Sequence, residues 1–526
     1  MSTAALPRSP WPSVADLLEM AARTLADRPA VIAGDLRLDY RTFADRVMRL
    51  ATGLGALGCG VGSRVVVLSQ NSLPVLELHY AIAVIGGTTV ALNTRFAGAE
   101  LSRCLENSAP DLVMVTGELA DRLPKDGPPV FVIDAPGDGG RSTRYEELIE
   151  GSAPREGVQR ASDTVAALFY TSGSTGAPKG VQLTHESVLA GALSCALAVG
   201  LDARSRWLHA SPMFHLADAW AIWAATMVGA CHVIERFEPR ATLETIRTEG
   251  ITHTILVPTA LDMLADAADG DATAFDSLGA MLYGGAPIAE TTYRRLVALG
   301  VPMFHTYGST ETSGCMAALR PEEHIRADGT LRLGVVGRAV PMTSIVIVDP
   351  DGQEVAPGQV GEITIVSPNL MIGYNQAPEQ TADVLKNGRY HTGDLGRVDA
   401  DGFVELSGRR KEMLISGGEN VYPNEVELAL REHPSVRDVG VGGLPDVRWG
   451  QRIAAVIVPT SGASLELDEC QSFLAGQLAG YKIPRAVFAV DELPRNASGK
   501  IDRAALNTLL SDLEQQNAER TVGSPA

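Results

Sequence analysis

A glycine- and hydroxyl-rich segment carries the strongest chemical signal in the sequence. Residues 170–180 read YTSGSTGAPKG and follow an apolar run, AALFY. Glycines let backbone N–H groups approach an anion, hydroxyl groups add donors, and Lys179 adds a positive charge. The segment differs from a Walker loop because Lys179 lies between Pro178 and Gly180. The pattern predicts a loop that binds polyphosphate, and a flexible surface turn is the alternative.

Four more motifs occur in the second half of the chain. They read YGSTE at 307–311, TGD at 392–394, GRRK at 408–411 and PRNASGK at 494–500. Together with the loop, in this order and at these intervals, they resemble the adenylate-forming superfamily of acyl-CoA synthetases, luciferase-like enzymes and adenylation domains. The resemblance extends from ALNTRFAGAEL, near residue 91, to Lys500. It implies ATP-dependent activation of a carboxylic acid to an acyl adenylate, then transfer to coenzyme A with release of AMP and pyrophosphate.

The resemblance assigns nucleotide-binding roles to several of these motifs. Tyr307 packs on the adenine ring, and Asp394 accepts hydrogen bonds from the ribose hydroxyls. Glu311 binds Mg²⁺ with Thr310 beside the phosphates, and Arg409 reinforces the ribose or phosphate contact. Taken singly, these residues have ordinary alternatives: a core tyrosine, an Asx turn or a helix cap. The full predicted ATP/AMP set is Thr171, Ser172, Gly173, Ser174, Thr175, Gly176, Lys179, Gly285, Ala286, Tyr307, Gly308, Asp394 and Arg409.

Lys500 is the catalytic lysine that the resemblance implies. Attack of a carboxylate on the α-phosphate adds negative charge to a crowded centre, where a point cation stabilises the transition state more than the ground state. Without the resemblance, a lysine after a glycine turn is usually a solvated side chain. Lys411 occupies the hinge position, with a surface lysine as the alternative. The predicted catalytic set is Lys500, Glu311, Thr310 and His215.

A coenzyme A site is expected after the hinge. In relatives that use coenzyme A, the C-terminal domain rotates, and a glycine-bearing segment lines the pantetheine tunnel. Residues 415–427, ISGGENVYPNEVE, resemble that segment, although a tight turn would also explain the glycines. The predicted CoA set is Gly417, Gly418, Trp449 and Tyr481, with Lys482 and Arg485 available to the phosphates.

The segment SPMFHLADAWAIWAATMVGA resembles the part that opens the acid pocket, with His215 as its aromatic gate. Phe214 is followed by His215 rather than by the aspartate of amino-acid-specific relatives, so an amino acid substrate is disfavoured. Asp218 is interpreted as a helix cap or surface group. The residues predicted to line the pocket are His215, Ala217, Ala221, Val257 and Gly284. Two alanines at i and i+4 share a helical face and leave space, which favours a long-chain or bulky apolar acid.

Composition excludes several other classes of protein. The 526 residues carry a formal charge of −19, which disfavours nucleic acid as a partner, and the apolar run 220–234 is too short to span a membrane. Residues 1–20 lack the pattern of a secretory signal. Six scattered cysteines suggest buried thiols in a reducing compartment, so we expect a cytoplasmic protein. Monomer and homodimer are both open alternatives.

Repeated βαβ patterns predict the elements that must position these residues. Strand-like runs alternate with helical patterns over most of the chain, whereas residues 334–366 favour antiparallel strands or a small barrel. We expect an α/β fold: a large N-terminal adenylation domain of α/β subdomains plus a small β-barrel-like part, and a small mobile C-terminal α+β domain. The expected boundaries are 1–407, a hinge at 408–411, and 412–526.

Three functions are compatible with this sequence. The first is an acid–CoA ligase, using ATP, Mg²⁺ and coenzyme A, that acts in fatty acid or lipid metabolism. The second keeps the adenylation but transfers the acyl group to a carrier protein or oxidises it, as luciferases do. The third is a non-catalytic homologue that binds acyl nucleotides. The segment 415–427 favours the first function, and no carrier module with a GGxS-type serine is present.

Overall fold

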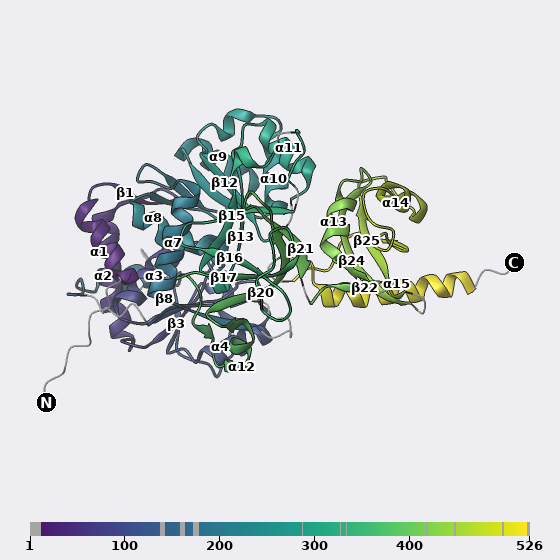
Figure 1. Cartoon of the computed structure of the whole chain (residues 1–526). Coiled ribbons are helices and arrows are strands. Elements are labelled where there is room, and N and C mark those ends of the chain that lie inside the picture. Colours follow the sequence, from purple (N-terminus) through teal and green to yellow (C-terminus); the bar gives the residue numbers. More distant parts are fainter. Residues whose placement is uncertain are drawn as a thin grey trace.

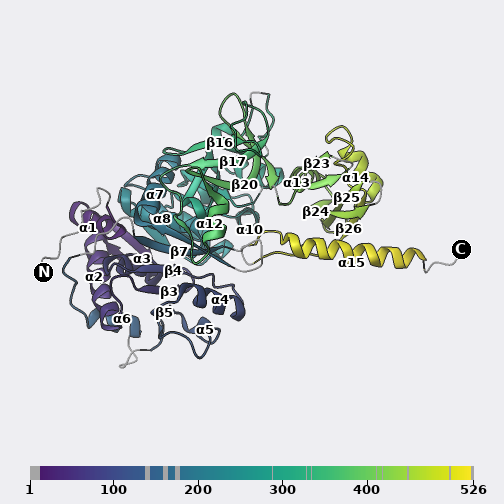
Figure 2. The same ribbon diagram turned by 60° about the horizontal axis from the view of Figure 1, so that its bottom comes forward.

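The structure is a computed structural model, and it describes residues 12–136, 143–157, 164–171, 178–286, 288–326, 328–332, 334–409, 411–416, 419–446, 449–496 and 499–522. A large body begins with helix α1 (Val14–Thr24), and a smaller unit ends with the long helix α15 (Arg503–Val522) (Figure 1). Figure 2 shows α15 extending away from the large body beside the smaller unit. The predicted fold class, a large α/β part with a small α+β part, is confirmed. The exact domain boundaries remain a prediction.

The largest sheet has 14 strands and combines a parallel half with an antiparallel half. Neighbouring strands pair in parallel from β1 to β13 and antiparallel from β13 to β16. The antiparallel strands expected in residues 334–366 are therefore present, as part of this sheet. Its strands, in order, are β16 (Ser344–Val348), β17 (Gly361–Val366), β20 (Arg389–Val398), β21 (Val404–Arg409), β15 (Val335–Ala339), β14 (Gly314–Leu319), β13 (Met303–Ser309), β12 (Ala280–Gly284), β11 (His253–Leu256), β9 (Arg206–His209), β10 (Cys231–Ile234), β1 (Pro29–Ala33) and β2 (Leu36–Asp39), with β19 (Leu385–Lys386) beside β20.

A second sheet of seven strands carries the predicted phosphate loop. Its central strands are parallel, as the βαβ pattern predicts, and β8 folds back antiparallel onto β7. The loop is the connection between those two strands. The strands, in order, are β18 (Gly373–Tyr374), β8 (Lys179–Thr184), β7 (Val165–Thr171), β4 (Thr88–Ala91), β3 (Arg64–Leu68), β5 (Leu112–Val115) and β6 (Val130–Val132).

Three helices that are buried around most of their circumference share one core with both large sheets. These are α3 (Leu73–Val84), α7 (His185–Val199) and α8 (Leu216–Val228), and most of their residues are buried. A helix that is apolar all round must lie inside a protein. The remaining helices of the large body are α2 (Tyr40–Ala56), α4 (Gly98–Ser108), α5 (Gly117–Ala120), α6 (Arg144–Glu150), α9 (Pro239–Glu249), α10 (Pro258–Ala268), α11 (Glu290–Ala298) and α12 (Pro378–Val384), with short 3₁₀ turns η1 (Ala272–Phe275), η2 (Thr310–Thr312) and η3 (Pro321–Glu323).

The smaller unit is built on a sheet of five strands. Helices α13 (Pro423–Arg431) and α14 (Leu467–Leu474) contribute to one apolar cluster of this unit, and α15 contributes to a second. The α+β architecture expected after the hinge is therefore present. The strands are β22 (Leu414–Ser416), β23 (Glu419–Val421), β24 (Val436–Asp446), β25 (Gly450–Pro459) and β26 (Ala486–Ala489).

A buried ion pair joins helices α2, α3 and α6. The Glu77 side chain has no exposed surface, and its Oε1 accepts from Arg46 Nε at 2.6 Å. Arg46 also donates to Glu146, and Tyr145 donates to Glu77. Burial raises the pKa of the Glu77 carboxyl, while Arg46 opposes that increase. A buried carboxylate that loses its cation is costly, so this pair is a sensitive point of the fold.

We predict that Arg46→Ala lowers the free energy of unfolding by about 3 to 5 kcal/mol, because Glu77 would be left buried without its cation. Urea unfolding would measure the change. The matched control is Arg41→Ala, because Arg41 pairs with Asp27 at the surface, where the side chains are 65% and 86% exposed. An equal loss of stability in the two variants would contradict the prediction.

Candidate functional site

The predicted phosphate loop begins at the end of β7 and ends at the start of β8. Thr171 and Lys179 face each other across this hairpin, and Lys179 Nζ lies 5.0 Å from the ring centroid of Tyr374. Burial lowers the pKa of Lys179, Lys411 lowers it further, and Glu311 opposes both effects. The hinge lysine and the phosphate-loop lysine are therefore close neighbours. The predicted residues Ser172, Gly173, Ser174, Thr175 and Gly176 lie outside the described residues.

Three predicted nucleotide residues, one each from β13, β20 and β21, meet on the large sheet. The Tyr307 hydroxyl donates to Asp394 Oδ2 at 2.6 Å, and Arg409 Nε lies 2.8 Å from Asp394 Oδ1. Asp394 raises the pKa of Arg409, and burial followed by Asp394 raises the pKa of Tyr307. The Asp394 carboxyl group is thus held beside an aromatic ring and a guanidinium. This arrangement matches what an adenosine group requires.

Glu311 lies in the turn η2 that follows β13. Its Oε1 accepts a hydrogen bond from the Tyr374 hydroxyl at 2.8 Å. Gly308, just before the turn, cannot carry a side chain, because a Cβ there would collide with the carbonyl oxygen of Gly314 and with Cys315 Cα. Tyr374 was not among the predicted residues, since a tyrosine in an apolar stretch has no distinctive motif.

The residues around Glu311 are suited to hold Mg²⁺ together with substrate phosphates. A carboxylate oxygen is a ligand that Mg²⁺ prefers, and this ion usually binds through one or two carboxylates and phosphate oxygens. Lys179, whose pKa responds to Glu311, is available to the same phosphates. Among the described residues, no group of three or more His, Cys, Asp or Glu side chains could hold a metal ion alone.

The smaller unit brings Lys500 to this site. Asn496 N–H donates to the Lys500 carbonyl oxygen, and Lys500 N–H donates to Asn496 Oδ1; these two bonds close a turn, which presents the lysine next to the large body. Lys500 Cε lies 3.7 Å from the place where a Cβ would stand on Gly285, whose φ is +76°. Lys500 keeps exposed surface, but desolvation by the neighbouring groups lowers its pKa, Arg409 lowers it further, and Asp394 and Glu311 oppose these effects. The predicted catalytic lysine, ribose acceptor and metal-binding carboxylate are therefore brought together.

His215 also lies within reach of the Lys500 charge. It is the N-cap residue of α8, and its buried Nε2 has no hydrogen-bond partner within the described part of the chain. Burial, then Lys500 and Arg95, lower the pKa of His215 to about 4, so the ring is neutral at neutral pH. Ala217 is exposed, Ala221 is fully buried in the core, and Val257 is 45% exposed. Their role in an acid pocket remains a prediction.

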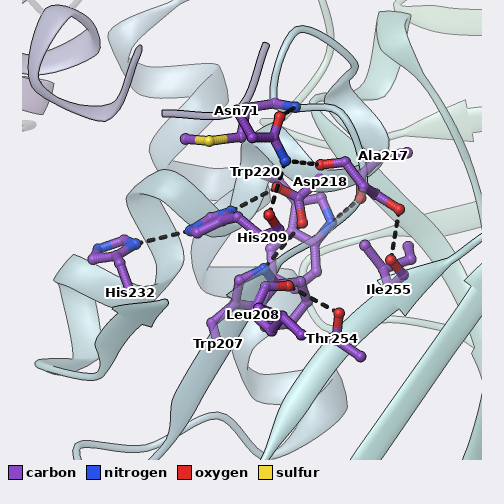
Figure 3. A network of polar contacts seen from close by, with 12 residues as sticks. Asn71, Trp207, Leu208, His209, Ala217, Asp218, Trp220, His232, Thr254 and Ile255 are labelled. Carbon is purple, nitrogen blue, oxygen red and sulfur yellow. Dashed lines mark hydrogen bonds and ion pairs between the residues drawn. The ribbon is translucent and has the colours of Figure 1, made fainter. Parts of the chain in front are cut away.

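The interpretation of Asp218 as a cap or surface group was wrong. Its side chain has no exposed surface and makes no cap hydrogen bond. Instead, Asp218 accepts from Trp207 Nε1 at 3.0 Å and lies 2.6 Å from His209 Nδ1 (Figure 3). Its position in the first turn of a helix suggested a cap, but strand β9 supplies both partners from the side.

The predicted coenzyme A residues lie in the smaller unit with different neighbours. The Arg485 guanidinium lies 4.0 Å from the ring centroid of Trp449. Tyr481 packs against the core of the unit, and Lys482 Nζ donates to Glu425 at 2.6 Å. Gly417 and Gly418 lie outside the described residues. The assignment of this set to coenzyme A remains a prediction.

Two general expectations can be checked against the structure. All six cysteines are unpaired and buried, as the scattered positions suggested. Among the helices of the described residues, none is long and apolar enough to cross a membrane.

Comparison with known proteins places the chain in a family. Residues 18–375 match the model of the AMP-binding enzyme family, and residues 425–500 match the model of the AMP-binding enzyme C-terminal domain. An indoleacetate–CoA ligase from Aromatoleum aromaticum is 36% identical over 90% of this chain and 93% of its own length. A fatty acid–[acyl-carrier-protein] ligase, ScoC, from Streptomyces coeruleorubidus is 33% identical over 91% of this chain and 92% of its own.

A solved structure leads to the same family. The o-succinylbenzoate coenzyme A synthetase (MenE) from Bacillus subtilis, in complex with ATP and magnesium ion, superposes with a TM-score of 0.82. It is 30% identical, and the match covers 94% of this chain and 99% of that one. The chain therefore belongs to the AMP-binding enzyme family. Within that family it is an AMP-forming acid–CoA ligase, which uses ATP, Mg²⁺ and coenzyme A.

A pair of carboxyl groups connects the large body with the smaller unit. Glu432 follows α13 in the smaller unit, and Glu290 begins α11 in the large body. Burial and then Glu290 raise the pKa of Glu432 to about 7, while Arg294 opposes the increase. A proton between the two carboxyl groups therefore favours this arrangement of the units. When Glu432 ionises, like-charge repulsion opposes it.

We predict that the arrangement seen here is favoured as the pH falls through about 7, because the raised pKa means that it binds a proton more tightly than a separated arrangement does. The adenylation rate, relative to the rate of thioester formation, should fall between about pH 6 and about pH 8. Pyrophosphate release in single-turnover experiments would measure this. Glu432→Gln should remove that component of the pH profile, and an unchanged profile would contradict the prediction.

Proposed function

We propose that Lys500, Glu311, Asp394 and Lys179 form the site where the acid is adenylated, and that the acid is long-chain or bulky and apolar. One observation carries the first part: Lys500, from the smaller unit, lies against Gly285, and its pKa responds to Asp394 and Glu311 of the large body. The Lys500 side chain keeps exposed surface, so its closeness to Gly285, Asp394 and Glu311 of the large body, rather than burial, supports this role.

In the first step, a carboxylate oxygen of the acid attacks the α-phosphorus of ATP. The new O–P bond forms as the bond to pyrophosphate breaks, and negative charge accumulates on the phosphoryl oxygens. The Lys500 ammonium stabilises that charge. Asp394 and Tyr307 hold the nucleoside, and Lys179 binds the departing phosphates together with the loop. Mg²⁺, held by Glu311, would neutralise phosphate charge when bound.

In the second step, the sulfur of coenzyme A attacks the acyl carbonyl, the C–O bond to AMP breaks, and AMP leaves. We propose that the smaller unit rotates about Lys411 for this step, so that Lys500 leaves and residues 415–427 face the acyl adenylate. The pH-dependent pair of Glu290 and Glu432 would separate at the same time. Trp449 and Tyr481 are the proposed contacts for the CoA adenine.

The substrate class is proposed from the pocket residues and from the relatives. Exposed Ala217 leaves room at the start of α8, and neutral His215 offers a flat ring rather than a charge. A pocket wall made of small apolar side chains and a neutral ring suits an apolar acid. The named substrates of similar proteins, indoleacetate and succinylbenzoate, are bulky aromatic acids. Involvement in lipid metabolism and a cytoplasmic location remain predictions.

A carrier protein is the second candidate acceptor. The similarity to ScoC, named as a fatty acid–[acyl-carrier-protein] ligase, supports this alternative. Adenylation would be identical, and only the thiol donor would change. Dependence on free coenzyme A distinguishes the two.

The proposed substrate is tested with a panel of free acids: short, medium and long fatty acids, aryl acids and polycyclic acids. Pyrophosphate, AMP and product mass are measured with and without coenzyme A. We expect acyl-CoA from a long-chain or bulky acid only when coenzyme A is added. Preference for a short polar acid would reject the substrate class, and pyrophosphate release that coenzyme A does not influence would favour the carrier protein.

We predict that Lys500→Ala lowers the adenylation rate about 100-fold or more, because the charge that develops at the α-phosphate loses its cation. Thioester formation from a supplied acyl adenylate should stay near the wild-type rate. Exposed Lys125 provides the control variant, Lys125→Ala, which should change neither half-reaction. Equal losses in both half-reactions of Lys500→Ala would refute the separate role of this lysine.

A further inference from the structure

A buried chain of hydrogen bonds lies beside the start of α8 and takes no part in the chemistry described above. From Asp218 it passes to His209, then from His209 Nε2 to His232 Nδ1 at 3.0 Å (Figure 3). From His232 Nε2 it continues to Thr226 Oγ1 at 2.9 Å. Tyr80, on α3, completes it with a 2.7 Å contact to Thr226. The chain joins β9, β10, α8 and α3.

The partners of Asp218 show which groups donate the hydrogen bonds that it accepts. Trp207 Nε1–H can only donate, so it is the donor to Asp218 Oδ1, and His209 Nδ1, 2.6 Å from Asp218 Oδ2, is the donor of the second bond in the tautomer that carries its proton on Nδ1. Both donors belong to β9, and neither Asp218 nor His209 has exposed side-chain surface. The first turn of α8 is therefore fixed to the end of one strand by two hydrogen bonds.

The segment between the bonded residues contains the predicted gate. His209 is the last residue of β9, and the chain then runs through Phe214 and His215 before it reaches Asp218. The hydrogen bond from His209 to Asp218 thus closes this short segment at both ends. We call residues 209–218 the gate segment.

Asn71 holds the middle of the gate segment. Its Nδ2 donates to the carbonyl oxygens of His209 and Ser211 at 2.8 and 2.7 Å, and its Oδ1 accepts from Met213 N at 2.8 Å (Figure 3). Ser211 Oγ donates to the Ile255 carbonyl oxygen at 2.6 Å. These bonds leave the gate segment little freedom, whereas His215 Nε2 has no partner within the described residues.

A buried carboxylate contributes little to stability for its own sake. Desolvation of a charge costs several kcal/mol, which its hydrogen bonds at best offset, and apolar replacements of buried ion pairs are often neutral. What such a group can provide is a defined position. Trp220 adds to this, because its Nε1 donates to the Ala217 carbonyl oxygen and its ring packs against Trp207 at 4.8 Å.

We propose that Asp218 is a positioning residue for acid recognition: through His209 and Trp207 it sets the place of His215 and Ala217 at the wall of the acyl pocket. This inference rests on the proposed function, because it assumes that His215 and Ala217 line the pocket. Asp218 itself touches no substrate. Its loss should therefore weaken recognition of the acid and leave recognition of ATP unchanged.

The test is Asp218→Asn, which keeps the shape but removes one of the two acceptor oxygens. We expect KM for the preferred acid to rise on the order of 10-fold, since small misplacements at a site have effects of this size or larger. KM for ATP should stay near wild type, and the ratio of activities between acids of different size should change. Trp207→Phe removes the indole N–H that donates to Asp218. It should also raise KM for the acid, but by a smaller factor.

Glu77→Gln is the matched control, because it also converts a fully buried carboxylate to an amide. The Glu77 carboxylate accepts hydrogen bonds from α2 and α6 and lies outside the gate segment. It should lower thermal stability without a change in KM for the acid. The proposal is overturned if KM for acid and ATP rise together, if neither changes, or if Glu77→Gln raises KM for the acid equally. If Asp218→Asn does not fold, Trp207→Phe decides by the same criteria. A wild-type enzyme that activates no acid of the panel rejects the proposed function instead.

Discussion

The structure depends on one electrostatic constraint: a lysine from the smaller unit must enter a site that already contains positive groups. Arg409 lowers the pKa of Lys500, and Lys411 does the same to Lys179. Glu311 opposes both effects, and Asp394 opposes the effect on Lys500. The carboxyl groups of Asp394 and Glu311 therefore reduce the repulsion among the positively charged side chains before ATP binds. A site with its charges already arranged need not reorganise during the reaction.

The fold supplies rigid supports for each of these charges. Asp394 and Arg409 face each other in the ladder between β20 and β21, and Tyr307 lies on β13 of the same sheet. Lys179 begins β8 of the second sheet. The helices α3, α7 and α8 share their core with both sheets, so the two sheets hold a fixed distance. Only Lys500 arrives from a unit whose sheet is separate.

Much of this arrangement could be predicted because the motifs are local and ordered. The alternation of strands and helices gave the fold class, and spaced motifs such as YGSTE and TGD located Tyr307 and Asp394. The sequence was misleading where the hydrogen-bond partner of a residue comes from an element far away in the chain. Asp218 resembled a helix cap, but its partners on β9 bury it. Tyr374 bonds Glu311 from a separate strand, β18, which no local pattern connects to η2.

The contact between Arg485 and Trp449 has a consequence for the intrinsic fluorescence of the protein. The five tryptophans are at positions 11, 207, 220, 223 and 449, so Trp449 is the one that follows the hinge. The guanidinium over its ring makes its surroundings sensitive to any group that displaces Arg485. Replacement of the four earlier tryptophans by phenylalanine would leave a single intrinsic fluorophore, and its emission would report on the smaller unit without an attached dye.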